Sequence, residues 1–353
     1  MRRSDLLSKV GNLQQVMYAR PVRYQDGRAD GMHAIEVKND DLRFVAMADK
    51  ALDIAELEYR GTALQFLSKP GLNGRNPFDT HGEEAVRSIM GGFFFTCGLE
   101  NIGGPYTDAA GKEYPLHGRL RTSPAEHIQY DVAWQGDECV ATVAGEVREA
   151  ELFGENLVLR RRIETRLGTP SIAVTDEIRN EGFADEPMMI MYHCNIGWPL
   201  VDEGSEIILP SLMAEPRDEA TERDATHWST IQAPEPNRPE SVFIHTLAGD
   251  ADGSTFAALV NEKLGLALLI EFSTAEFPYF MEWKSMASGD YVIGLEPANS
   301  SVRGRGFHEQ QGDLHHLAAQ SSEVKRLTFT VVSGAKEIAE LRERRDRLTK
   351  AAG

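Results

Sequence analysis

The sequence predicts an all-β protein, a large antiparallel β-sandwich with a helix at its C-terminal end. Most of the 353-residue chain reads as short β-branched or aromatic runs separated by Gly, Pro, Asn and Asp. Helical patterns do not alternate with these runs, which argues against a doubly wound α/β fold. Packed antiparallel sheets are the usual way to bury so many short strands.

The predicted strands follow one another along almost the whole chain. There are more of them than one flat sheet usually holds, so we expect at least two sheets packed face to face. In chain order the predicted strands occupy residues 32–37, 42–47, 63–67, 92–96, 157–167, 172–178, 187–193, 207–209, 241–245, 256–260, 266–272, 279–283, 292–295 and 327–332.

Two segments are predicted to be helical. Residues 5–15 would form a short helix with Ser4 as its N-cap. Residues 336–350 carry a thin apolar stripe and oppositely charged pairs at helical spacing, Glu340 with Arg344 and Glu343 with Arg347. This second helix is expected to lie on the sandwich. Residues 214–239 are rich in Pro, Glu and Asp and are predicted to form a long surface loop.

The charge of the chain limits its partners. It has 37 Lys and Arg against 55 Asp and Glu, a formal net charge of −18, and a sequence pI near 5.0. A surface this acidic repels phosphate backbones and anionic lipid headgroups, so neither nucleic acid nor a membrane is an expected partner. Because no apolar run approaches about 18 residues, no transmembrane helix is expected either.

Cysteine usage and the N-terminal sequence favour a cytoplasmic location. The three cysteines show no CxxC spacing, so neither a disulfide scaffold nor a zinc ribbon is indicated. Cys97 and Cys194 are expected to be small buried apolar residues. The polar segment that follows Arg2 and Arg3 contains no apolar stretch typical of a signal peptide.

Three polar spots stand out within otherwise apolar sequence. His117 lies in the run YPLHGR, His193 ends the apolar run MMIMY, and Glu296 ends the apolar run VIGL just before Pro297. A polar residue at the end of a buried strand can be held rigidly while it faces a cleft. A lone histidine at such a position is more often structural, but two histidines and a glutamate together form an acid–base set.

Other histidines are assigned to the surface. His315 and His316 are adjacent, so in a strand they would point to opposite faces, and His308 has no obvious carboxylate pattern around it. We therefore expect no metal site among them.

Read jointly, the three spots carry a family resemblance. In the order HGR, YHCN and EPAN across an all-β chain, the sequence resembles the aldose 1-epimerase (galactose mutarotase-like) superfamily, and within it the bacterial branch described as DUF4432. The most specific stretches are TCGLENIG at residues 96–103 and PLHGR at residues 115–119, and the segment DKALDI at residues 49–54 followed by Gly61 also fits.

The resemblance implies a fold and a chemistry. It implies a β-supersandwich that binds a monosaccharide in an open groove, without a cofactor. His117 would bind near the ring or C1 oxygen, His193 would be the general acid toward the ring oxygen, and Glu296 would be the general base. Interconverting anomers needs such a pair, with the glutamate ionised and the histidine protonated, which a neighbouring carboxylate favours.

The resemblance is incomplete at positions that bear on the substrate. The second histidine is followed by CNIGW where an aromatic Phe-Asn-Leu type sequence is typical, and Arg119 stands where glycine is common. Residues 96–101 replace the usual Gly-Arg-x-x-Asn-Arg stretch.

Several further residues are candidates for holding the sugar. Arg119, two residues from His117, would share its face if the chain were extended, and its guanidinium would then favour an anionic or highly oxygenated sugar. For every candidate, surface pairing or core filling is an equally good explanation. The candidates for binding hydroxyl groups are Arg119, Asn195, Lys284, Glu100 and Asn101, and those for stacking on the ring are Trp198 and Trp283.

The leading hypothesis is therefore an aldose 1-epimerase-like enzyme acting on a free sugar or sugar derivative, with no metal. One alternative is a non-catalytic carbohydrate-binding or sensor protein on the same fold. Another is a sugar isomerase or lyase that uses the same acid–base pair. A glycoside hydrolase is less favoured because only Glu296 is a well-supported carboxylate. We expect one domain spanning residues 1–353, because the three spots must meet in one groove, and the sequence allows a homodimer.

Overall fold

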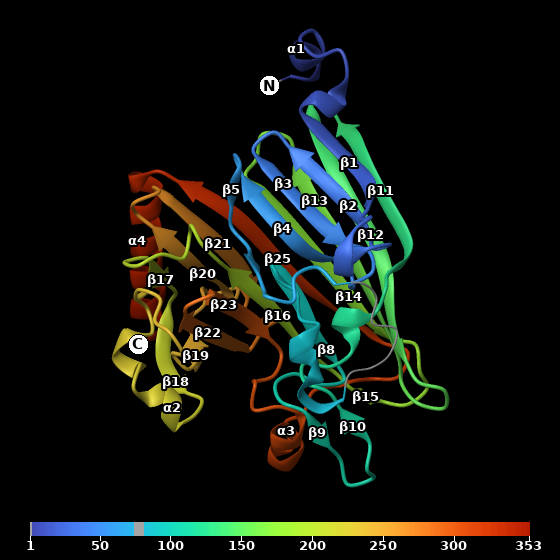
Figure 1. The fold of residues 1–353 in the computed structure, drawn as a ribbon, viewed down its shortest axis with the longest axis vertical. Helices are drawn as coiled ribbons and strands as arrows, with labels where there is room; N and C mark the ends of the chain where they lie inside the picture. The colour runs from blue at the N-terminus through green and yellow to red at the C-terminus, as the bar shows by residue number, and fades with distance from the viewer. Residues whose placement is uncertain (1, 74–80) are drawn as a thin grey trace.

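The chain folds into three antiparallel sheets built around a shared apolar core. The computed structural model describes residues 2–73 and 81–353. One hydrophobic cluster draws buried side chains from all three sheets, for example Val37, Phe44, Phe94, Ile163 and Phe329. The predicted all-β sandwich is thereby confirmed. Figure 1 shows the five-stranded sheet (blue) over the upper part of the large sheet and strands β19, β22 and β23 at the lower left.

The largest sheet has eight strands and forms one side of the sandwich. Its order is β11 (Glu126–Gln135), β12 (Glu138–Ala150), β13 (Asn156–Arg166), β14 (Ser171–Asn180), β25 (Ser322–Ser333), β21 (Leu266–Ser273), β20 (Ser254–Asn261) and β17 (Glu206–Ile208).

Two further sheets supply the other core-facing side chains. The six-stranded sheet has the order β18 (Ser211–Pro216), β19 (Ser241–Leu247), β22 (Tyr279–Ala287), β23 (Asp290–Ala298), β16 (Met189–Ile196) and β8 (Phe94–Leu99). The five-stranded sheet has the order β1 (Met17–Arg23), β2 (His33–Asn39), β3 (Leu42–Met47), β4 (Asp53–Tyr59) and β5 (Thr62–Ala63).

Short strand pairs and helices occupy the connections. The pairs are β6 (Phe66–Leu67) with β7 (Gly91–Gly92), β9 (Tyr106–Thr107) with β10 (Glu113–Tyr114), and β15 (Glu186–Pro187) with β24 (His316–Leu317). The α-helices are α1 (Arg3–Leu7), α2 (Glu219–Glu222), α3 (Arg305–Gln311) and α4 (Ala335–Ala352). Single 3-10 turns cover Leu13–Gln15, Gly27–Ala29, Gly82–Arg87, Leu120–Thr122 and Ala225–His227.

The strands β22, β23, β16 and β8 of the six-stranded sheet are buried on both faces, and consecutive residues point in opposite directions. In β16, Tyr192 and Cys194 belong to the core between the sheets, whereas Met189 and Met191 pack in a separate cluster on the outer face. Alternation therefore turns His193 toward the outer face.

A fully buried ion network lies on the core side of this sheet. The guanidinium of Arg161 donates to the carboxylates of Asp53 and Asp176 at 2.6–3.2 Å and to the hydroxyl of Thr96 at 2.8 Å. Tyr192 donates to the same Asp176 carboxylate at 2.5 Å. Because these residues come from all three sheets, the network ties the sheets together directly behind the outer face of β16 and β8.

The two predicted helices had different outcomes. The C-terminal helix is confirmed as α4, where buried Ile338 and Leu341 pack on the large sheet. The predicted helix at residues 5–15 is wrong in extent, because α1 ends at Leu7 and Ser4 does not cap it. Asn12 accepts a hydrogen bond from the Gln14 amide and starts a separate 3-10 turn.

The strand pattern missed several strands, among them β1, β11 and β12. β1 and β11 are largely solvent-exposed, so neither shows the apolar runs that mark the other strands. β12 alternates buried residues with partly buried or exposed ones and has many small or charged side chains. The predicted loop at residues 214–239 contains the end of β18, α2 and one 3-10 turn. Among the described residues, no helix is long and apolar enough to cross a membrane.

Candidate active site

A cavity of about 460 Å³ lies against the outer face of the six-stranded sheet, and His117, His193 and Glu296 all line it. β16 contributes His193 and Asn195, β8 contributes Phe95, and β23 contributes Glu296. Loop residues close the other sides. The structure thus brings together three residues that are far apart in sequence, as the proposed acid–base set requires.

The pairing of β16 with β23 places His193 beside Glu296. In this register Cys194 lies opposite Leu295. The Nε2 atom of His193 is 3.2 Å from Oε1 of Glu296, and their side chains are 9% and 2% exposed. Neither Nδ1 of His193 nor Oε1 of Glu296 has a well-aligned hydrogen bond to another described residue. The sequence suggested that each residue lies at the end of its strand, but both lie within their strands.

His117 lies on a tight turn that aims its ring into the cavity. His117 and Gly118 both have left-handed backbone angles, with φ of 60° and 70°. A Cβ at position 118 would come within 2.4 Å of the Gly98 carbonyl oxygen, so only glycine fits there. The Gly103 amide donates to Nδ1 of His117 at 3.3 Å, which leaves Nε2 as the protonated nitrogen of the neutral ring. The His117 ring lies 5.6 Å from that of His193.

Burial dominates the protonation of the cavity residues. It lowers the pKa of His193 to about 3 and raises the pKa of Glu296 well above its usual range, with Glu240 adding to the rise. Burial also lowers the pKa of His117 well below its ordinary value. Near neutral pH the His193–Glu296 pair therefore favours one shared proton and no net charge. The expectation that the neighbouring carboxylate would hold His193 protonated in the free protein is not supported, because desolvation outweighs the attraction.

Aromatic rings enclose the pair. Phe95 stacks on the His193 ring with centroids 4.5 Å apart, and Trp283 meets it edge-on at 5.2 Å. Trp283 and Asn195, two of the residues predicted to bind the sugar, both line the cavity. The Asn195 amide donates to the His193 carbonyl at 2.9 Å, which fixes its orientation.

Arg119, Glu100 and Asn101 do not line the cavity. Arg119 has φ of −104° and ψ of −19°, so the chain after His117 is not extended and the two side chains do not share a face. The Arg119 guanidinium instead binds both Glu100 oxygens at 2.6 Å. The Asn101 amide donates to the carbonyls of Gly104 and Pro115 and so ties together two loops at the cavity.

Lys284 and Trp198 also lie away from the cavity lining. Lys284 is on the core side of β22, where its ammonium donates to the carbonyls of His227 at 2.7 Å and Thr230 at 2.5 Å. Burial lowers the pKa of Lys284 to about 8. Trp198 is 71% exposed at the surface. For these two residues, as for Arg119 and Glu100, the geometry favours a structural role.

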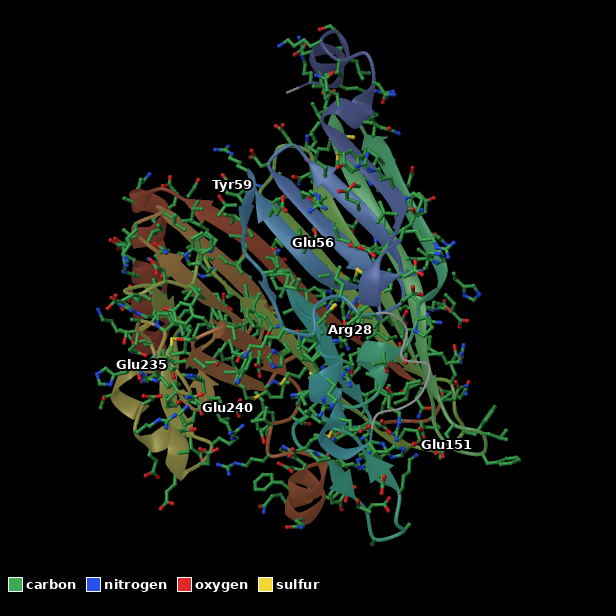
Figure 2. The ribbon with its side chains drawn as sticks, viewed as in Figure 1. Arg28, Glu56, Tyr59, Glu151, Glu235 and Glu240 are labelled. Carbon is green, nitrogen blue, oxygen red and sulfur yellow. The ribbon has the colours of Figure 1, made fainter. Side chains whose placement is uncertain are left out.

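Three charged residues that line the cavity escaped the sequence analysis: Glu83, Arg217 and Glu240. Arg217 and Glu240 line the cavity beside Trp283, and Glu240 lies where β19 begins (Figure 2). Arg217 belongs to the segment predicted as a surface loop. A charged residue in a charged loop has no sequence pattern that distinguishes it from its neighbours. Only the folded structure shows that it lines the cavity.

The remaining histidines include one correction. His308 was expected at the surface, but its side chain is 1% exposed and its Nε2 accepts a hydrogen bond from the Ser301 amide at 3.0 Å. Its Nδ1 lies 2.9 Å from the Asp313 carboxylate. His308 therefore orders the loop that follows β23. His315 is partly exposed and His316 exposed, as expected.

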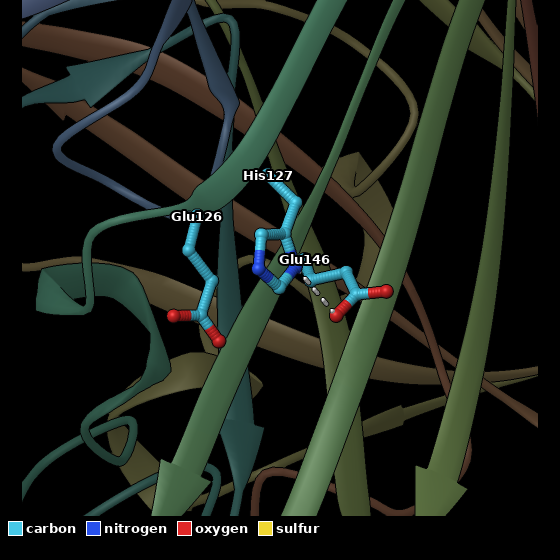
Figure 3. A group of neighbouring side chains, drawn as sticks. All are labelled: Glu126, His127 and Glu146. Atoms are coloured by element: carbon cyan, nitrogen blue, oxygen red, sulfur yellow. Dashed lines mark hydrogen bonds and ion pairs between the residues drawn. The ribbon is translucent and has the colours of Figure 1, made fainter.

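A surface cluster of metal-ligand residue types lies on the large sheet, and none of its three residues lines the cavity. Glu126, His127 and Glu146 hold potential ligand atoms within 4.8 Å of one another (Figure 3). Both carboxylates already face guanidinium groups, with Arg160 2.7 Å from Glu146 and Arg148 3.7 Å from Glu126. The ion pairs account for this arrangement without a metal.

Comparisons with known proteins agree with the fold. A Klebsiella pneumoniae protein provisionally assigned as an aldose 1-epimerase has a TM-score of 0.88 at 23% identity, covering 98% of this chain and 90% of that one. A galactose mutarotase-like protein from Clostridium acetobutylicum has a TM-score of 0.64 at 13% identity, with coverage of 90% and 99%. Galactose 1-epimerase from Lactobacillus acidophilus has a TM-score of 0.56 at 12% identity, also with coverage of 90% and 99%.

At these identities the structural matches establish the fold alone. No protein with a curated description matches the chain. The sequence profile of DUF4432, a domain of unknown function, matches residues 29–331. That range covers most of the chain and contains the HGR, YHCN and EPAN motifs. The chain therefore belongs to the DUF4432 family and has the galactose mutarotase-like fold.

Proposed function

We propose that this protein is an aldose 1-epimerase-like enzyme that interconverts the anomers of a monosaccharide. The observation that carries the proposal is the convergence of His193, Glu296 and His117 on one cavity, with Nε2 of His193 3.2 Å from Oε1 of Glu296. A cavity of about 460 Å³ has room for one sugar ring and falls in the range typical of small-molecule sites.

The chemistry needs one group that removes the anomeric hydroxyl proton and one that protonates the ring oxygen. We assign Glu296 as the base and His193 as the acid. In the resting pair one proton is shared between the Glu296 carboxyl and Nε2 of His193. Its transfer to Nε2 yields the carboxylate and the imidazolium that this assignment uses. His117, with its protonated Nε2, is placed to donate a hydrogen bond to a sugar oxygen. Once the ring is open, rotation about C1–C2 allows closure on either face.

Related structures support the proposal at the level of the fold. The proteins with the same fold include one described as a galactose 1-epimerase. The substrate of the present protein is an aldose or an aldose derivative in this proposal, and its reaction needs only the residues of the chain.

The direct test is the rate of anomer exchange, measured by NMR exchange spectroscopy on a panel of pure aldoses. Wild-type protein should accelerate exchange, and Glu296→Gln should slow the catalysed rate about 10²–10⁴-fold. Glu282→Gln is the matched control, because Glu282 forms a similar pair with His245 on the opposite face of the sheet and does not line the cavity. It should leave the rate unchanged.

The alternatives give different results in the same experiment. Saturable sugar binding without accelerated exchange, in wild type, would indicate a binding or sensor protein. A product with a new mass or new NMR signals would indicate a lyase or an isomerase. Equal exchange rates for wild type and Glu296→Gln would refute the assigned role of Glu296.

A further inference from the structure

Arg217 is anchored at the cavity by two carboxylates. Its Nε donates to Asp218 at 2.7 Å and its Nη2 donates to Glu240 at 3.1 Å. The Arg217 side chain is 32% exposed and lines the cavity, and no described residue accepts a hydrogen bond from its Nη1. The guanidinium is therefore held in one orientation with donor capacity left over.

Trp283 and Glu240 form a continuous wall of the cavity between Arg217 and the His193–Glu296 pair. Trp283 lies edge-on to the His193 ring at 5.2 Å, and its indole N–H donates to Oε2 of Glu240 at 2.8 Å. The other oxygen of Glu240 accepts from Arg217. A sugar that places its anomeric centre at His193 and Glu296 would have other ring positions along this wall.

The charge balance of the wall is unfavourable for anions. Among the described residues that line the cavity, the full charges available near neutral pH are those of Arg217 and two carboxylates, Glu83 and Glu240, because the His193–Glu296 pair carries no net charge. Arg217 is already balanced by Glu240 and by Asp218. The two cations that would have attracted an anionic sugar, Arg119 and Lys284, bind elsewhere.

We propose that Arg217 and Glu240 form a specificity subsite that binds neighbouring hydroxyl groups of an uncharged sugar and disfavours sugar phosphates and uronates. This inference rests on the proposed function. A pair of hydroxyls suits the site because each hydroxyl can accept from the guanidinium and donate to the carboxylate. A phosphate or a carboxylate can only accept, so it would leave the Glu240 oxygens facing a like charge.

The experiment compares Arg217→Met with Arg342→Met. Arg342 is a matched control: its side chain is 31% exposed and also binds two carboxylates, but it lies on α4 and does not line the cavity. Binding is measured by ligand-observed NMR titration with glucose, galactose, their monodeoxy analogues, glucuronate and glucose 6-phosphate. The titration does not require turnover, so it remains informative if exchange catalysis is absent.

We expect wild type to bind a neutral hexose more tightly than its uronate or its phosphate. Arg217→Met should weaken binding of that hexose about 10- to 100-fold, as expected for lost hydrogen bonds to a charged group, while Arg342→Met leaves it unchanged. The loss should vanish for the one or two deoxy sugars that lack the hydroxyls bound by Arg217. Where exchange is catalysed, the effect should appear in KM more than in kcat.

A second variant tests the charge argument without removing the arginine. Glu240→Gln retains an oxygen for the Trp283 indole and removes one negative charge, so binding of the uronate should improve relative to the neutral sugar. The inference is overturned if wild type prefers the anionic sugars, or if Arg217→Met and Arg342→Met weaken binding equally. Failure of the proposed function looks different, because it abolishes catalysed exchange in the wild type while the binding preferences remain measurable.

Discussion

Two histidine–glutamate pairs lie on opposite faces of the six-stranded sheet. In one, Nε2 of His193 is 3.2 Å from Oε1 of Glu296, and in the other, Nε2 of His245 is 3.3 Å from Oε2 of Glu282. Burial raises the pKa of both glutamates. By distance and chemistry alone the two pairs are nearly equivalent.

Their surroundings differ. The His245–Glu282 pair is fully buried in the core, where Trp228 packs on the His245 ring at 5.0 Å and Ser211 Oγ lies 2.9 Å from its Nδ1. The His193–Glu296 pair lines the cavity, and Nδ1 of His193 has no hydrogen-bond partner among the described residues. The comparison teaches that a close His–carboxylate contact does not itself make a site, and that access for a ligand distinguishes the two pairs.

The largest expected difference is in catalysis. Replacement of His193 by Asn should lower the anomer-exchange rate about 10²–10⁴-fold, because the acid is lost. Replacement of His245 by Asn should lower thermal stability but leave the rate per folded molecule intact. The measurement is NMR exchange normalised to the folded fraction from circular dichroism. Equal loss of rate in the two variants would remove the distinction between the pairs.

Both glutamates, Glu296 and Glu282, should make the stability of the protein depend on pH. Folding raises the pKa of Glu296 and of Glu282 above the ordinary value of 4.5, so the folded state holds these protons more tightly. Their stabilising contribution is complete below about pH 4.5 and is lost as pH rises toward the folded-state pKa.

Glu296→Gln and Glu282→Gln should therefore each gain stability relative to wild type as pH rises above 4.5, with a slope of up to about 1.4 kcal/mol per pH unit. Urea denaturation at a series of pH values measures this gain. A constant difference between variant and wild type across the series would contradict the raised pKa values.

The Ser211 hydroxyl, which lies beside Nδ1 of His245, should contribute only to stability. Ser211→Ala removes the hydroxyl next to Nδ1 and should destabilise the fold by about 0.5–1.5 kcal/mol, the usual net value of one hydrogen bond. The exchange rate should not change. Chemical denaturation and NMR exchange on the same sample decide this, and a slower reaction would mean that the core pair communicates with the cavity.

The smallest effect is expected at Arg119. Its guanidinium binds Glu100 and does not line the cavity, so Arg119→Met should change KM for any sugar, neutral or anionic, by less than about twofold. Steady-state measurement with a neutral sugar and a uronate is sufficient. A selective loss of uronate binding would restore Arg119 as a substrate-binding residue.

Much of the fold could be read from the chain, and the exceptions have physical causes. Strands that are buried on both faces, such as β16 and β23, have continuous apolar runs and were predicted. The exposed strand β11 carries charged and polar residues and gives no such signal. The helix predicted at residues 5–15 was overestimated because Asn12 offers the backbone a competing local hydrogen bond.

The candidate site divides in the same way. The motifs around His117, His193 and Glu296 were visible because polar residues interrupt apolar sequence, and the structure brings all three to one cavity. Arg119 and Lys284 were candidates by residue type, but the turn after His117 and the alternation in β22 direct them elsewhere.

The all-β class, the C-terminal helix and the residue types of an acid–base set follow from the amino-acid sequence alone, because strand periodicity and motif composition are local properties. Which of the two similar His–Glu pairs faces a cavity, and that Arg217 and Glu240 line it, depends on the folded arrangement of the chain. Those facts depend on strand register and on how loops cross the sheet, so they arise from contacts between residues far apart in the chain. Burial likewise decided the protonation of His193 and Glu296, since desolvation depends on everything packed around a group and not on its sequence neighbours.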